Sequence, residues 1–368
     1  MLTPESTPVL EVSHLVKSFA VRQSILAALQ QKPPTEIRAV DDVSFKLERG
    51  EVLALVGESG CGKTTIAKTL IGLEEPTNGE IRFSGEIVSA SVRRTRAGML
   101  VLDSGRVGTR EHMTLPHMSL KRLRQHAQMI FQDPYESLNP RATVFDIVAE
   151  PLEVHGLARK REERLDRVRS ALDDAGLRPA ESFFERFPHE LSGGQRQRVV
   201  IAAAMVLKPE LLLADEPVSM LDVSIRAEIL NLLSDLRRQR GVSILFITHD
   251  LGTVSHFADR IAVMYLGRLV EFGPTRDVLQ RPQHPYTKAL LSVVPVPNPR
   301  LRRERVILQG ETPNAANIPS GCRFHPRCPV VMGRCENEDP LYTLVGEEHE
   351  AACWLLEQPG SERAAATA

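Results

Sequence analysis

Residues 57–65 read Gly-Glu-Ser-Gly-Cys-Gly-Lys-Thr-Thr, a pattern that can hold a chain of phosphates. Glycines let backbone N–H groups turn inward around phosphate oxygens. A helix that follows directs its positive end at the same anion. In such a loop Lys63 pairs with the β- and γ-phosphates, and the Thr64 hydroxyl ligates Mg²⁺. The candidate nucleotide-binding residues here are Gly57, Ser59, Gly60, Cys61, Gly62, Lys63, Thr64 and Thr65.

Two adjacent carboxylates, Asp215 and Glu216, end the apolar run Leu211–Ala214. Carboxylates at the end of a buried strand are costly unless they meet a cation or a proton. We expect Asp215 to hold Mg²⁺, directly or through water, and Glu216 to orient or deprotonate an attacking water. The alternative, an acidic strand end that caps the next turn, does not explain two carboxylates after four apolar residues. The chemistry predicted is hydrolysis of a nucleoside triphosphate.

A third motif, Leu191-Ser192-Gly193-Gly194-Gln195, precedes the helical run Gln195–Met205. It predicts a second helix N-terminus that can bind phosphate.

The elements that must position these motifs follow from hydrophobic periodicity. Val52–Val56 is a continuous β-branched and apolar run that leads into the phosphate loop, as expected for a strand buried on both faces. Strands and helices alternate afterwards, which predicts an α/β fold with a mainly parallel sheet. The other expected elements are strands at Leu10–Leu15, Val43–Leu47, Leu211–Ala214 and Ile244–Thr248, helices at Ile66–Leu73 and Arg226–Gln239, a mostly helical stretch at Thr143–Leu177, and a loop at 22–37.

The chain carries the phosphate loop first, then LSGGQ, then the strand that ends in Asp-Glu. In this order of motifs it resembles the ATP-binding subunit of an ABC transporter. The resemblance implies a P-loop NTPase cassette with a RecA-like core, an antiparallel β part and a helical subdomain. It also implies ATP and Mg²⁺ as ligands and an active ATPase. By the same resemblance Gln132 reaches the metal and the lytic water, His249 contacts the γ-phosphate, and Phe19 stacks on adenine. Taken alone, each of these three residues would more often be structural.

In proteins of this kind the LSGGQ motif covers the ATP bound to a partner subunit. The resemblance therefore assigns Ser192, Gly193, Gly194 and Gln195 to the partner's ATP, and it gives Asp222 a part in joining the two halves. Met220 stands where the family usually has Ala, which is a mild departure.

Three further segments narrow the resemblance to transporters of oligopeptides and dipeptides, a group that includes importers of nickel and glutathione. They are Phe131–Val144, Gln283–Pro295 and Gly321–Pro329. The resemblance covers about residues 10–85 and 127–355. It implies two membrane permease subunits, a second ATP-binding subunit (a paralogue or the chain itself), and indirectly an extracytoplasmic substrate-binding protein. It also implies that Asp133–Pro140 and the helices after it form a groove for a short helix of the permease.

Composition along the chain indicates the domains. We expect a cassette over 1–272, with a helical subdomain at about 133–195 and a polar, irregular insertion at 86–126. Prolines become frequent after Gly273, which marks a C-terminal domain over 273–355. The last residues, 356–368, read as a disordered tail.

Four of the five cysteines, Cys322, Cys328, Cys335 and Cys353, fall near the C-terminus. In a reducing compartment such a group favours a metal over disulfides. Their spacing is wider than in structural zinc sites and differs from common ferredoxin patterns. Some members of the transporter group carry a four-iron four-sulfur cluster here, which we expect. Zinc with His325 as a ligand, or reduced thiols without metal, are the alternatives.

The net charge of −1 gives no support to a nucleic-acid partner. A soluble ABC ATPase acting on DNA or ribosomes would more often carry two cassettes, coiled coils or basic arms. A redox-regulated ATPase is the other alternative. The longest apolar run, Val199–Leu207, is far shorter than the roughly 20 residues of a membrane span. The N-terminus lacks the pattern of a signal peptide. We therefore expect a peripheral protein at the cytoplasmic face of the membrane.

Overall fold

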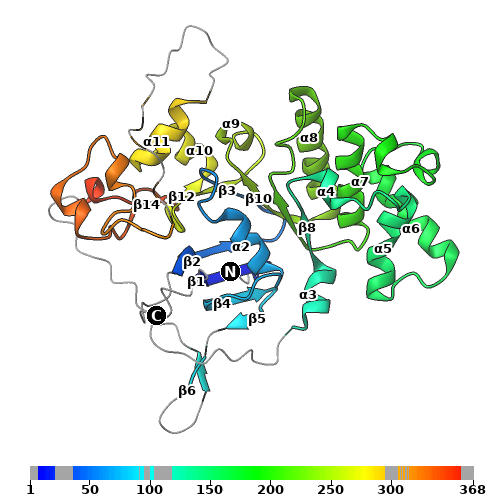
Figure 1. Cartoon of the computed structure of the whole chain (residues 1–368), viewed down its shortest axis with the longest axis horizontal. Coiled ribbons are helices and arrows are strands. Elements are labelled where there is room, and N and C mark those ends of the chain that lie inside the picture. The colour runs from blue at the N-terminus through cyan, green and yellow to red at the C-terminus, as the bar shows by residue number, and fades with distance from the viewer. Residues whose placement is uncertain are drawn as a thin grey trace, which may run out of the picture. The chain divides into compact units, whose positions relative to one another are not determined.

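The computed structural model describes residues 7–20, 36–90, 92–94, 100–102, 118–294 and 315–357, with the single residues 306, 308, 310 and 313 (Figure 1). The chain divides into two compact units. The first is built from Met1–Ser18, Val40–Ala54 and Lys63–Thr248, and the second from Phe19–Ala39, Leu55–Gly62 and His249–Ala368. The phosphate loop belongs to the second unit up to Gly62 and to the first from Lys63 onward.

The first unit contains a four-stranded sheet in the order β2-β1-β4-β5. Buried and exposed positions alternate in β2, as expected for a sheet with one face on the core. Both predicted strands of this region form and are longer than expected. The predicted loop at 22–37 lies outside the described residues except for its last two, which belong to β2. The strands are β1 (Leu10–Ala20), β2 (Glu36–Leu47), β4 (Asn78–Phe83) and β5 (Glu86–Ala90).

A second layer of the first unit is the parallel series β10-β9-β8, which β3 extends. Every residue of β3, β9 and β10 is buried, as the continuous apolar runs predict. In register, Ile244 of β10 lies opposite Leu212 of β9, and Ala127 of β8 lies opposite Leu211. The elements are β3 (Val52–Val56), α2 (Lys63–Leu70), β8 (Ala127–Ile130), β9 (Leu211–Asp215), α8 (Val223–Arg240) and β10 (Ser243–Thr248).

Helices between β8 and β9 form a group of their own, drawn in green in Figure 1. Helix α5 packs against α6 and α7. Its start is fixed by a capping box, in which Thr143 and Asp146 bond each other's backbone N–H groups. The elements are α4 (Pro134–Ser137), α5 (Val144–His155), α6 (Arg161–Asp174), η1 (Ala180–Phe183), η2 (Pro188–Glu190) and α7 (Gly193–Met205).

The interpretation of 86–126 as an irregular loop is wrong for its described parts. Strand β5 pairs with β4 and buries Val88 and Ala90, and β6 (Val92–Arg94) pairs with β7 (Leu100–Leu102). Helix α3 (Leu120–His126) follows. Two buried positions in a five-residue segment are too weak a local pattern to indicate a strand. Pairing with β4 stabilises it. Residues 91, 95–99 and 103–117 lie outside the described residues.

The second unit carries the antiparallel series β13-β14-β12-β11. The last residues of β3 lie beside β11 as the next strand of this sheet. The buried Glu271 of β12 accepts hydrogen bonds from the backbone N–H groups of Gln283 and His284. The elements are α9 (Leu251–Val254), β11 (Arg260–Tyr265), β12 (Arg268–Pro274), α10 (Thr275–Gln280), α11 (Pro285–Ser292), η3 (His325–Arg327), η4 (Gly333–Glu336), β13 (Tyr342–Leu344), β14 (Glu350–Ala352) and η5 (Trp354–Leu356).

Residues 358–368 of the predicted tail lie outside the described residues, and Leu356 still belongs to η5. Among the helices of the described ranges, none combines the length and the apolar character that a membrane span requires.

Candidate functional site

The phosphate loop leaves β3 in a conformation that requires glycine. Gly60 and Gly62 have φ of +79° and +111°, a region that L-residues avoid. A Cβ on Gly57 would lie 2.2 Å from the Met264 carbonyl oxygen. The N–H of Gly267 donates to the Cys61 carbonyl oxygen at 2.9 Å, which fixes the middle of the loop. Close backbone contacts therefore contribute to the shape of the loop.

At the start of α2, Lys63 is buried and Thr64 hydrogen-bonds the Asp215 side chain. Burial raises the pKa of Asp215, as does the charge of Glu216, while Thr64 and Lys63 oppose the shift. One carboxylate oxygen of Asp215, Oδ1, is buried without a hydrogen-bond partner within the described residues. A hydroxyl beside an unsatisfied carboxylate oxygen is a donor set that suits Mg²⁺. These residues fit the predicted Mg²⁺–ATP.

Glu216 is held at the end of β9 in a strained backbone conformation, with φ of +46°. Its N–H donates to the Ile247 carbonyl oxygen at 2.9 Å. Gln132, just after β8, donates from Nε2 to Glu216 Oε2 at 3.2 Å. Non-glycine residues with positive φ are uncommon and cluster at functional sites. The fold thus brings together Glu216 and Gln132, both of which were expected beside the attacking water.

Asp215→Asn is expected to raise the Tm of the nucleotide-free protein at neutral pH while removing Mg²⁺-dependent hydrolysis. A carboxyl whose pKa is raised on folding lowers stability as pH rises through the interval between its unfolded and folded pKa values. That cost is fully present above the folded pKa, and Asn removes it. The Tm difference should therefore be larger at pH 7.5 than at pH 4.5, measured in EDTA. Asp222→Asn, at an exposed carboxylate, is the control. A lower Tm for Asp215→Asn at pH 7.5 would contradict the destabilisation assigned to the buried Asp215 charge.

His249 and Phe19 belong to the second unit. His249 is exposed and follows β10 directly, just before the Asp250 that caps α9. Phe19 lies near the end of β1 with 36% of its surface exposed, so it is not a core residue. Exposure leaves both side chains able to meet a nucleotide, and their roles stay predictions.

The LSGGQ motif forms a helix start, as predicted. Ser192 accepts a hydrogen bond from the Gln195 N–H, and the Gln195 side chain accepts one from the Ser192 N–H, at 3.3 and 3.0 Å. A Cβ on Gly194 would lie 2.8 Å from Ile225 of α8, so α7 and α8 pack closely there. The S-x-x-Q spacing of Ser192 and Gln195 is the sequence signature of a capping box and indicates this arrangement. Asp222 is exposed at the N-cap of α8.

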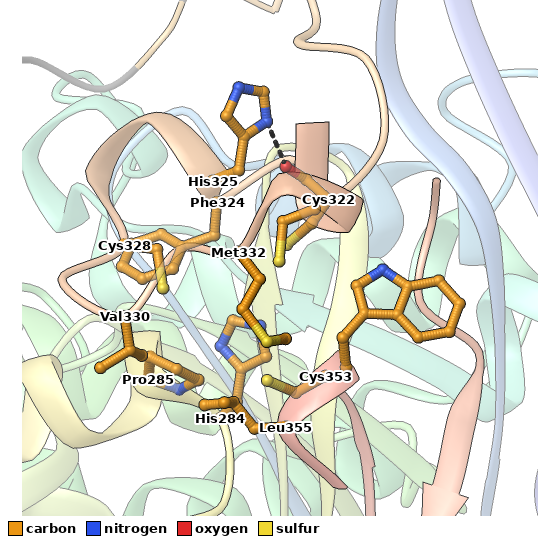
Figure 2. A pocket seen from close by; sticks show the side chains of 12 residues that line it. His284, Pro285, Cys322, Phe324, His325, Cys328, Val330, Met332, Cys353 and Leu355 are labelled. Carbon is orange, nitrogen blue, oxygen red and sulfur yellow. Dashed lines mark hydrogen bonds between the residues drawn. The ribbon is translucent and has the colours of Figure 1, made fainter. Parts of the chain in front are cut away.

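The four C-terminal cysteines line one small cavity in the second unit (Figure 2). Met332 and Trp354 line it as well. None of the cysteines forms a disulfide. Burial raises the pKa of the Cys322 thiol to about 11 and raises the pKa values of Cys328 and Cys353. The donor set suits a soft metal. In the described part of the chain, however, no three His, Cys, Asp or Glu side chains are arranged to hold a metal ion.

His325, the alternative zinc ligand, has its Nδ1 3.0 Å from the Cys322 carbonyl oxygen (Figure 2). Sequence reasoning also missed Glu58, Tyr286 and Arg327, which meet at the phosphate loop. The only local signal was an arginine next to a cysteine, which carries no chemistry by itself.

Two family models match the chain. The model "ABC transporter" matches residues 40–219, and "Oligopeptide/dipeptide transporter, C-terminal region" matches residues 270–335. Among solved structures, cbiO1 of Clostridium perfringens, part of the ABC transporter complex cbiONQ, has a TM-score of 0.56 at 26% identity, covering 75% of this chain and 92% of that one. A dimeric post-hydrolysis state of the ATP-binding cassette MJ0796, bound to ADP and Pi, has a TM-score of 0.56 at 26% identity, covering 73% and 99%. These findings confirm the predicted cassette fold.

Curated relatives match along nearly their whole length. The oligopeptide transport ATP-binding protein AppF of Bacillus subtilis is 42% identical over 96% of this chain and 99% of its own. The dipeptide transport ATP-binding protein DppF of Haemophilus influenzae is 44% identical over 96% of this chain and 98% of its own. The chain belongs to the family of ATP-binding subunits of ABC transporters for oligopeptides and dipeptides.

Proposed function

We propose that this chain hydrolyses ATP to power the import of oligopeptides or dipeptides. The observation that carries the proposal is the group formed by Thr64, Asp215, Glu216 and Gln132 in the first unit. Thr64 and Asp215 would hold Mg²⁺, which neutralises phosphate charge when bound. Glu216 accepts the proton of the attacking water, and Gln132 holds the Glu216 carboxylate in place. Lys63 stabilises negative charge on the phosphates.

Two chains are proposed to enclose ATP between them. The capped start of α7 presents Ser192, Gly193 and Gly194 at a helix N-terminus, where the positive dipole end attracts phosphate. The cassette MJ0796, whose fold this chain shares, is dimeric in its solved structures. The second ATP-binding subunit is a paralogue or another copy of this chain, and Asp222 contributes to the contact between the two ATP-binding subunits. His249 is proposed to contact the γ-phosphate, and Phe19 is proposed to stack on adenine.

The remaining partners are proposed to meet the chain at the cytoplasmic face of the membrane. Around Asp133–Pro140, Phe131 and Tyr135 expose 40% and 57% of their surfaces. Exposed aromatic side chains are typical of contact sites for partner helices. We infer that each of two permease subunits docks a short helix there. An extracytoplasmic binding protein would deliver the peptide. Residues 273–355 would form the C-terminal domain, in keeping with the family model that begins at residue 270.

Peptide uptake tests this function. Cells that need a labelled peptide as their source of an essential amino acid should grow with the wild-type chain and its permeases. Cells with the Glu216→Gln variant should not grow on the peptide but should grow on the free amino acid. Equal growth on peptide with both chains would overturn the proposal.

We further infer that the four cysteines bind a metal, for which a four-iron four-sulfur cluster is proposed and zinc is the alternative. Metal binding releases protons from thiols and would close the cavity around the ion. Protein purified without oxygen should show broad brown absorption and about four irons per chain, the content of such a cluster. One zinc per chain without colour would identify the alternative. Removal of the metal should lower the Tm. A colourless, metal-free protein with unchanged Tm would exclude a metal at this place.

A further inference from the structure

Glu58, the second residue of the phosphate loop, is held through both its main chain and its side chain. Its N–H donates to the Tyr286 hydroxyl oxygen at 2.9 Å. Its carboxylate accepts two hydrogen bonds from Arg327, at 2.8 and 3.2 Å. The Arg327 side chain is 9% exposed and that of Glu58 is 25% exposed, so water screens this ion pair only in part. A bidentate pair of this kind fixes orientation as well as charge.

Arg327 reaches the loop from the cysteine-rich segment, where it directly precedes Cys328. In the same segment, Phe324 packs edge-on against Tyr265 with ring centroids 5.3 Å apart, and it contacts Tyr286 at 5.4 Å. Arg323 donates to the Leu266 carbonyl oxygen. The next residue, Gly267, holds the Cys61 carbonyl oxygen of the loop. Both arginines between Cys322 and Cys328 are therefore linked to the phosphate loop. Arg327 bonds Glu58 directly, and Arg323 bonds the turn between β11 and β12, whose Gly267 bonds Cys61.

Tyr286 is also held in place by its surroundings. It is fully buried near the start of α11, and its N–H donates to His284 Nδ1 at 3.1 Å. Burial lowers the pKa of His284 to about 4, so the ring stays neutral and keeps an acceptor nitrogen. The His284 N–H is in turn bound by Glu271. The backbone of Tyr286, whose hydroxyl meets Glu58, is thus fixed by two consecutive buried hydrogen bonds.

We propose that Arg327 and Tyr286 are positioning residues for ATP, by which the cysteine-rich segment sets the geometry of the phosphate loop and its affinity for nucleotide. Arg327 also neutralises Glu58, whose negative charge within the loop would otherwise repel phosphate. The inference rests on the proposed ATPase function. It adds that the C-terminal region positions the Gly57–Gly62 part of the phosphate loop, with which it shares the second unit.

Nucleotide affinity and turnover of the full chain test the proposal. Arg327→Ala is expected to raise the Kd and KM for Mg²⁺–ATP about tenfold, a size typical of coupling between sites, with a smaller change in kcat. Arg327→Lys, which keeps the charge without the bidentate geometry, should fall between. Tyr286→Phe should also weaken ATP binding, because it keeps the ring but leaves the part-buried Glu58 N–H without its acceptor.

A double variant, in which Glu58 is changed together with Arg327, separates a positioning role from a general loss of structure. Glu58→Gln in the Arg327→Ala background should recover part of the lost affinity, because the unpaired carboxylate is gone. Arg334→Ala is the matched control, since Arg334 directly precedes Cys335 but pairs with Glu338 and Glu357 at the surface. It should leave the Kd unchanged.

Unchanged ATP affinity in Arg327→Ala, with wild type active, would overturn the inference. So would an equal loss in Arg334→Ala, which would mean that any disturbance of the C-terminal region suffices. Absence of ATP binding and hydrolysis in the wild type would instead overturn the proposed function itself.

Discussion

Glu216→Gln is expected to lower the rate of ATP hydrolysis by about a thousandfold, the scale of losing a general base. The amide keeps the size of the side chain and its reach to Gln132, which lies 3.2 Å from Oε2. It cannot accept a proton from the attacking water. Residues that bind the phosphates are untouched, so the variant should still bind Mg²⁺–ATP with a Kd near that of the wild type.

Phosphate release and gel filtration with ATP measure the two effects. The variant should accumulate as an ATP-bound dimer, because hydrolysis no longer separates the subunits. Glu228→Gln changes an exposed carboxylate on α8 that pairs with Arg198, and it should leave turnover intact. Turnover of Glu216→Gln at the wild-type rate would remove Glu216 from the chemistry.

Gly62→Ala is expected to abolish ATP binding, with a Kd at least about a hundredfold higher, as small displacements at such sites can cost. The new Cβ would lie 2.1 Å from the Ala39 carbonyl oxygen, closer than any real Cβ contact. Gly62 also has φ of +111°, which alanine resists. The loop must therefore shift, and Lys63 follows Gly62 directly.

Gly60→Ala provides the matched comparison within the same loop. Gly60 has φ of +79°, but no described atom lies within 4 Å of its added Cβ. We expect a loss of stability of about 1 kcal/mol from backbone strain alone, with measurable ATP binding. Calorimetric titration with ATP and the Tm of both variants test the difference. Equal Kd values for the two variants would show that close approach at Gly62 is not what shapes the loop.

Local motifs explain why so much of the site could be predicted. The strand β9 and the carboxylates Asp215 and Glu216 are contiguous, and an apolar run that ends in acid already defines a strand and its functional edge. The same holds for Ser192, whose capping partner is three residues away. In contrast, the five residues of β5 gave little local signal. Val88 and Ala90 are its buried positions, and the hydrogen bonds that stabilise the strand come from its pairing with β4.

By itself, the sequence determined the phosphate loop, the Asp-Glu strand end, the LSGGQ helix start and the family. Each depends on residues close along the chain, where sterics and hydrogen bonding act without the rest of the fold. Only the tertiary structure decided which distant side chains meet these motifs. Gln132 and Glu216 are 84 residues apart, and Glu58 and Arg327 are 269 apart. Such contacts depend on strand order and on packing between distant segments, which no local pattern encodes.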